Sequence, residues 1–76
     1  MQKSYTTQIK KFGKEIKRRR SEFKITQEDL AAYCDIDVRT VQRIEKGEYG
    51  IGLHIVFALS LAFKTTPSEL LSCLKV

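Results

Sequence analysis

The sequence predicts a small all-α domain of five short helices. Apolar residues recur at helical spacing along the chain, and no stretch alternates polar and apolar residues as a strand would. Its 76 residues suffice for one domain with a modest core, and 42% hydrophobic with 30% charged residues is typical of a folded chain. We expect one domain over residues 1–76, with residues 1–6 forming a flexible basic arm.

The first two helices are expected at residues 7–23 and 27–34. Ile9, Phe12 and Ile16 recur at helical spacing in the first, and Arg20 interrupts this apolar stripe. The second helix follows a start signal, "TQED", in which Thr26 caps the first amides and the aspartate three residues later completes a capping box.

The remaining helices are bounded by turn and cap residues. Asp35 can take the left-handed conformation that ends a helix, and Asp37 is expected to cap a third helix that ends near Lys46, before Gly47. After the loop "GEYGIG" a fourth helix is expected at residues 52–63, and Pro67 opens a fifth.

The positive charge is concentrated in the first third of the chain. Residues 1–24 hold nine Lys and Arg against two acids, and residues 25–76 hold five against seven, which together give the net charge of +5. Clustered cations attract phosphates and release counterions on binding, so the pattern favours a nucleic-acid partner. An anionic membrane surface or simple solubility would also suit this charge.

The third helix carries a face of hydrogen-bond donors. Val41 and Ile44 point inward, and the opposite arc of about 100° holds Arg39, Gln42, Arg43 and Lys46. A short helix, a tight turn and a second helix with such a face are what a helix-turn-helix requires in the major groove. The alternative is that these residues only keep a surface helix soluble.

Three groups of residues give the chain a family resemblance over residues 12–71. They are Phe12-Gly13, then Thr26-Gln27 with Leu30-Ala31, and finally Val41, Ile44-Glu45 and Gly47. With them the sequence resembles the phage Cro and repressor-like family, also called the xenobiotic-response-element type. The resemblance implies a five-helix, lambda-repressor-like DNA-binding domain with the helix-turn-helix at its second and third helices.

The resemblance also implies roles for individual residues. The expected base contacts are Val38, Arg39, Gln42 and Arg43. It also implies a phosphate contact for Gln27, which would steady the third helix as well, and a phosphate or nearby base contact for Thr40. From their positions, Lys46 farther along the third helix, Lys24, and Tyr49 beside the glycine-rich loop are expected to contact phosphates too; a plain flexible connector is the alternative for that loop. In the family, the acid matching Glu45 pairs with the arginine matching Arg20, and we expect a partly buried ion pair here.

The fourth helix is apolar nearly all round, which a monomer does not need. We assign its core side to Leu53, Val56, Phe57, Leu59 and Phe63. The other apolar residues are expected either in a homodimer interface or under the chain's own ends: Ile55, Ala58, Leu61 and Ala62, with Leu71 and Leu74 of the fifth helix. His54 has no second ligand at suitable spacing and is expected at the surface or interface rather than on a metal.

The predicted function is sequence-specific binding of double-stranded DNA by a transcription regulator, a repressor that binds a palindromic operator as a homodimer. The alternative is a protein-interaction module that docks a partner such as a toxin. An enzyme is not expected, because one histidine without nearby carboxylates and no nucleotide loop leave no catalytic constellation.

Other partners are not expected either. Nothing indicates a cofactor, a metal or a small-molecule effector, and two cysteines suit free thiols in a reducing cytoplasm. The longest apolar stretch, residues 53–63, is shorter than the roughly 18 to 20 residues that a membrane span needs.

Overall fold

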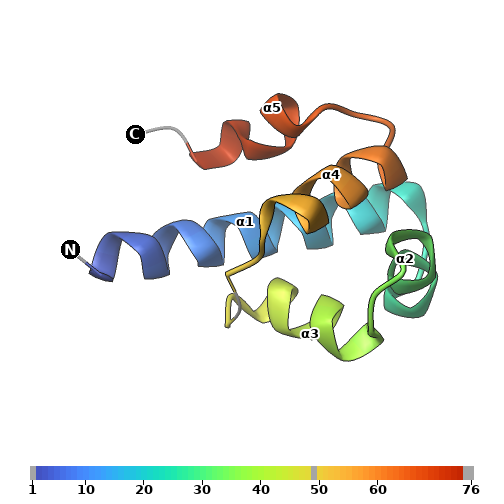
Figure 1. Ribbon diagram of the computed structural model, residues 1–76, viewed down its shortest axis with the longest axis horizontal. Helices are drawn as coiled ribbons and strands as arrows, with labels where there is room; N and C mark the ends of the chain where they lie inside the picture. The colour runs from blue at the N-terminus through green and yellow to red at the C-terminus, as the bar shows by residue number, and fades with distance from the viewer. Residues whose placement is uncertain (1, 49, 75–76) are drawn as a thin grey trace.

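The computed structural model describes residues 2–48 and 50–74, with side chains from residue 5 onward. Within these ranges all regular secondary structure is helical, without a strand, as predicted. Its elements are α1 (Gln2–Phe23), α2 (Gln27–Cys34), α3 (Val38–Lys46), α4 (Leu53–Ala62), α5 (Pro67–Leu70) and a 3₁₀ helix, η1 (Leu71–Leu74). The long α1 crosses the middle of the molecule, with α3 along one edge and α5 along the opposite edge (Figure 1).

The first helix is longer than the sequence predicted. It begins at Gln2 rather than at residue 7, so residues 2–6, which we expected as a flexible arm, continue α1. These positions contain neither proline nor glycine, and nothing in them stops a helix that starts further along the chain from extending toward its N-terminus.

The caps that bound α2, α3 and α5 follow the sequence with one exception. Thr26 and Asp29 form both hydrogen bonds of the capping box at the start of α2. Asp35, with φ of 57°, and Gly47, with φ of 75°, end α2 and α3 in the left-handed conformation. Asp37 stands at the N-cap of α3 but makes no side-chain cap bond; instead its carbonyl accepts from the amides of Thr40 and Val41.

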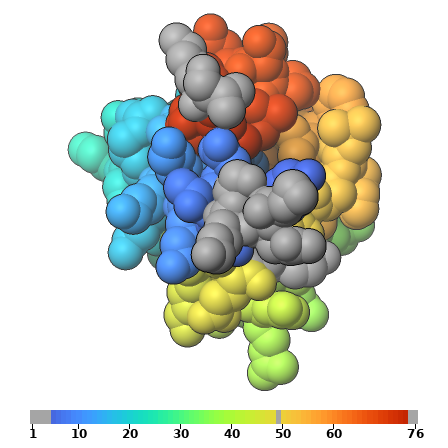
Figure 2. Space-filling model, turned by 90° about the vertical axis from the view of Figure 1, so that its left-hand side faces the viewer, coloured from blue at the N-terminus to red at the C-terminus, as the bar shows by residue number. Residues whose placement is uncertain are grey.

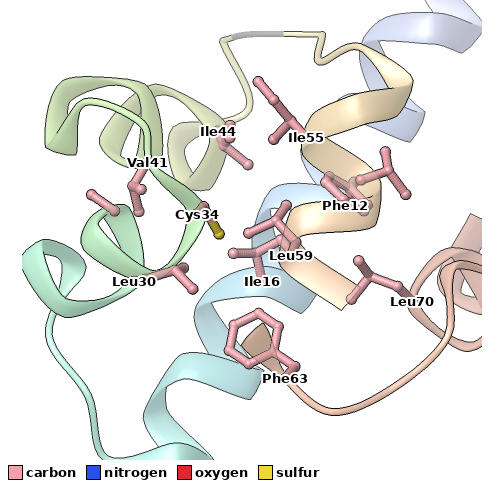
Figure 3. Packing of buried hydrophobic residues seen from close by; sticks show 12 residues of the cluster. Phe12, Ile16, Leu30, Cys34, Val41, Ile44, Ile55, Leu59, Phe63 and Leu70 are labelled. Atoms are coloured by element: carbon pink, nitrogen blue, oxygen red, sulfur yellow. The ribbon is translucent and has the colours of Figure 1, made fainter. Parts of the chain in front are cut away.

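The core lies where α1, α2, α3 and α4 meet. Ile16, Leu30, Leu59 and Leu70 are fully buried at its centre. Figure 3 shows side chains from every one of these helices and from α5 converging there. Because α3 packs against both α1 and α2, its position is set by the core and not by the loops that flank it.

The burial of α4 corrects the prediction. Ile55, assigned to a dimer interface, is only 5% exposed and belongs to the core, whereas Leu53 and Phe57, assigned to the core, are 68% and 51% exposed. Leu61 is 79% exposed, as expected for an interface residue. Val56, Leu59 and Phe63 are buried as predicted, so the buried side of the helix is shifted in part and not reversed. An almost uniformly apolar helix carries no polar face that would fix its orientation in advance.

The fifth helix is also different from the expectation. After Pro67, capped by Thr66, the chain makes one turn of α-helix and then tightens into η1. Leu74 packs against the core, and Leu71 stays 36% exposed. No helix within the described residues is long and apolar enough to cross a membrane.

Candidate nucleic-acid interface

The outer face of α3 presents a row of long polar side chains. Val41 and Ile44 are each 1% exposed and fasten the helix to the core. The exposed residues of α3 are Arg39, Gln42, Arg43 and Lys46. The helix forms the lower edge of the molecule in Figure 1, and its side chains project outward in Figure 2. An α-helix on such an edge can enter a DNA major groove without obstruction.

The first turn of α3 also holds two smaller predicted contacts. Val38 and Thr40 are both half-buried, and Val38 packs against the core. Each therefore has a partly exposed side chain next to the longer donors. Tyr49, predicted as a phosphate contact, lies outside the described residues.

An ion pair joins α1 to α3 behind this face. Arg20 Nε donates to Glu45 Oε2 at 2.7 Å, and Arg20 Nη2 donates to Glu45 Oε1 at 3.2 Å. The two side chains are 16% and 5% exposed, so the pair is largely removed from water. The hydrogen bond to Glu45 raises the pKa of the Arg20 guanidinium, which keeps this side chain charged.

Two further hydrogen bonds complete the Arg20–Glu45 cluster. Gln27 Nε2, at the start of α2, donates to Glu45 Oε1 at 3.0 Å, and Arg20 Nη1 donates to the carbonyl of Ile25 at 3.1 Å. The carboxylate of α3 is thus held by both α1 and α2. This network satisfies charges that would be costly to bury alone, and it fixes the orientation of α3 relative to α1 and α2.

A groove of about 710 Å³ opens between α1 and α3 above this cluster. Lys17 and Lys24 line it from the α1 side, Gln42 and Lys46 line it from α3, and Gln27 stands at the start of α2. Helix N-termini and lysines both favour anions. Lys17 was not among the predicted contacts, although the seven-residue spacing of Lys10, Lys17 and Lys24 could have indicated it.

The charges of α1 are sorted onto two sides of the helix. On one side Arg18 donates to Glu15 and Glu22 at 2.6 Å, and Arg19 donates to Glu15 at 2.7 Å. The hydrogen bond from Arg18, with the help of Arg19, lowers the pKa of Glu15, so this carboxylate stays ionised beside them. The arginines of α1 are therefore matched by acids, and no ion pair among the described side chains of the helix uses a lysine.

An apolar face on α4 lies apart from α3. We define the α4 face as Leu53, Phe57 and Leu61, which recur every four residues and are the exposed large hydrophobic side chains of this helix. Of the other residues predicted at an interface, Ala58 and Ala62 are half-buried and pack against the core, as does Leu74. The structure thus divides the predicted interface set between the core and the surface.

Comparisons with known proteins agree with this arrangement. A family model described as helix-turn-helix matches residues 16–70. The crystal structure of the restriction-modification controller protein C.AhdI from Aeromonas hydrophila is similar, with a TM-score of 0.79 and 29% sequence identity. That similarity covers 82% of this chain and 94% of the other. No curated protein matches the sequence significantly.

Proposed function

Because this chain belongs to the Cro/C1-type helix-turn-helix family of DNA-binding transcription regulators, we propose that it is a repressor that binds a palindromic operator as a homodimer. The observation that carries the proposal is the exposed donor face of α3, held in position by the buried Arg20–Glu45 cluster. The fixed position of α3 matters because base readout requires side chains placed to within a fraction of an ångström.

Readout of bases is assigned to the first two turns of α3. Arg39 and Arg43 can pair bidentately with guanine, Gln42 can pair with adenine, and Val38 can contact a thymine methyl group. Phosphate contacts are assigned to Lys46 at the end of α3 and to Gln27, Thr40, Lys24 and Tyr49 around it. Gln27 gives one amide hydrogen to Glu45 and has a second one for a phosphate.

The homodimer rests on the α4 face. Three large apolar side chains in line, 51% to 79% exposed, form a contact that a monomer rarely leaves open. A two-fold axis through such a face would present two copies of α3 to half-sites about 34 Å apart. Leu71, 36% exposed on η1, is a further contact in this proposal.

The same face supports a second candidate function, the docking of a different protein such as a toxin. The identity of the neighbouring gene would distinguish a restriction-modification controller from an antitoxin. Similarity to a restriction-modification controller favours a restriction or modification gene there, whereas a toxin gene would favour an antitoxin. In either setting the DNA contacts of α3 are the same.

The proposal is tested by selecting bound sequences from a random duplex library and then measuring affinity for the selected site. Arg39→Ala and Arg43→Ala should each weaken binding to that site by about 1 to 3 kcal/mol and relax the preference at one base pair. Arg18→Ala, which removes an exposed arginine on α1, is the matched control and should retain the preference. Enrichment of no sequence, or an equal effect of all three variants, would argue against base readout by α3.

A further inference from the structure

Three exposed lysines stand at seven-residue intervals along α1 and just beyond its end. We call Lys10, Lys17 and Lys24 the lysine edge. Seven residues are close to two helical turns, so successive members drift by only about 20° and Lys10 and Lys17 share one side of the helix. Lys24 follows directly after α1, with φ of 57°.

The lysine edge runs beside the C-terminal half of α3, from Gln42 to Gly47. Lys10 lies against the C-terminal end of α3, since a Cβ added at Gly47 would be 2.7 Å from Lys10 Cγ. Lys17 and Lys24 line the groove together with Gln42 and Lys46 of α3. The edge and the base-reading face of α3 are therefore neighbouring strips of one surface.

The charge of the lysine edge is not cancelled inside the part of the chain that the structure describes. The ion pairs found there use Arg18, Arg19 and Arg20, and none involves a lysine of the edge. The carboxylate nearest the groove, Glu45, is engaged by both Arg20 and Gln27. Because Arg20 neutralises the charge of Glu45, an anion can approach the lysines without repulsion from this carboxylate.

We propose that the lysine edge binds phosphates of the DNA strand that runs alongside α3, outside the base pairs read by α3. This inference rests on the proposed DNA binding, and it extends the backbone contact already proposed for Lys24 along α1 to Lys17 and Lys10. Lysine acts on phosphate as a point charge, so the edge contributes affinity without sequence preference and holds α3 in register along the groove.

The experiment measures the dependence of DNA affinity on salt for single variants Lys10→Gln, Lys17→Gln and Lys24→Gln and for the triple variant. The probes are a duplex selected by the wild-type protein and a random duplex. Each lost phosphate contact should lower the slope of log K against log salt by about 0.9, and the triple variant should lose between about 2 and 3. Both duplexes should be affected equally.

Lys11→Gln is the matched control, because it removes the same charge about 100° further round α1. Burial raises the pKa of the Cys73 thiol on η1, and Lys11 opposes that shift, which places Lys11 toward η1. Melting temperatures check that each variant is folded. The lysine edge would be overturned if the triple variant kept the wild-type salt slope, or if Lys11→Gln lowered the slope as much as a single variant of the edge. The proposed function would still stand in that case, provided that the wild-type protein prefers the selected duplex. A wild-type protein without any preference would instead count against the proposed function.

Discussion

At the scale of single residues, Arg20 and Glu45 show which side-chain contacts the sequence pattern predicts and which it does not. Arg20 breaks the apolar stripe of α1, and Glu45 is the acid beside the buried side of α3; the family resemblance pairs them, and the structure places them 2.7 Å apart. The resemblance also implied that Gln27 steadies the third helix, but not that it does so by donating to Glu45. That contact depends on where the N-terminus of α2 lies in space, which local patterns do not determine.

The pair makes a testable prediction at this scale. Arg20→Met leaves Glu45, 5% exposed, buried without its partner, and breaking a buried pair in this way costs roughly 3 to 5 kcal/mol of unfolding free energy. Urea denaturation measures the loss. Arg18→Met also removes an arginine from an ion pair on α1, but from an exposed one, and its midpoint should stay near that of the wild-type protein. Equal midpoints for both variants would mean that the Arg20–Glu45 pair adds little to stability.

At the scale of elements, the sequence predicted where helices begin and end better than it predicted which side of a helix is buried. The boundaries of α2 and α3 and the start of α5 are set by local chemistry, such as the Thr26 capping box, the left-handed Gly47 and Pro67, and they agree with the structure. The phase of α4 was wrong because Leu53 and Phe57 are as apolar as Ile55, so only packing against α2 and α5 decides which are buried.

The contact between α1 and α3 gives the second prediction. A Cβ at Gly13 would overlap the carbonyl oxygen of Ile44 and lie 3.0 Å from that of Glu45. Alanine is favoured over glycine inside a helix by about 1 kcal/mol, but separating two backbones costs more, so Gly13→Ala should destabilise the protein by about 1 to 3 kcal/mol.

The same shift would move α3, so DNA affinity should fall together with stability. Gly50→Ala is the control, because its Cβ would meet only Ile9 Cδ1, at an ordinary 3.4 Å. Thermal unfolding and DNA titration of the two variants provide the measurements. A Gly13→Ala protein more stable than wild type would show that the helices are not in close contact at this position.

At the scale of the whole molecule, the site is assembled from segments that the sequence keeps apart. The groove combines α1, the start of α2 and the side of α3, and Lys17 enters it because α1 crosses α3 at Gly13. The donors of α3 were predictable because one helical wheel contains them. A surface shared by three elements requires their crossing angles, which arise from the packing of the core.

The last prediction concerns assembly. If the α4 face joins two copies, Phe57→Glu places a charge on each side of a symmetric contact, and the like charges meet across the two-fold axis without solvent between them. The protein should sediment as a monomer at concentrations where the wild-type protein is a dimer, and it should occupy selected half-sites independently. Because Phe57 is 51% exposed, folding of the monomer should be little affected.

Tyr5→Glu offers the matched control for that variant, since it also replaces an exposed aromatic ring, 69% exposed on α1, with an acid. It should sediment as the wild-type protein does. A wild-type protein that is monomeric at tens of micromolar, or a Phe57→Glu variant that remains dimeric, would contradict an interface at the α4 face. A variant that becomes monomeric yet binds both half-sites with undiminished cooperativity would instead place the coupling between half-sites in the DNA, because no protein contact would remain to carry it.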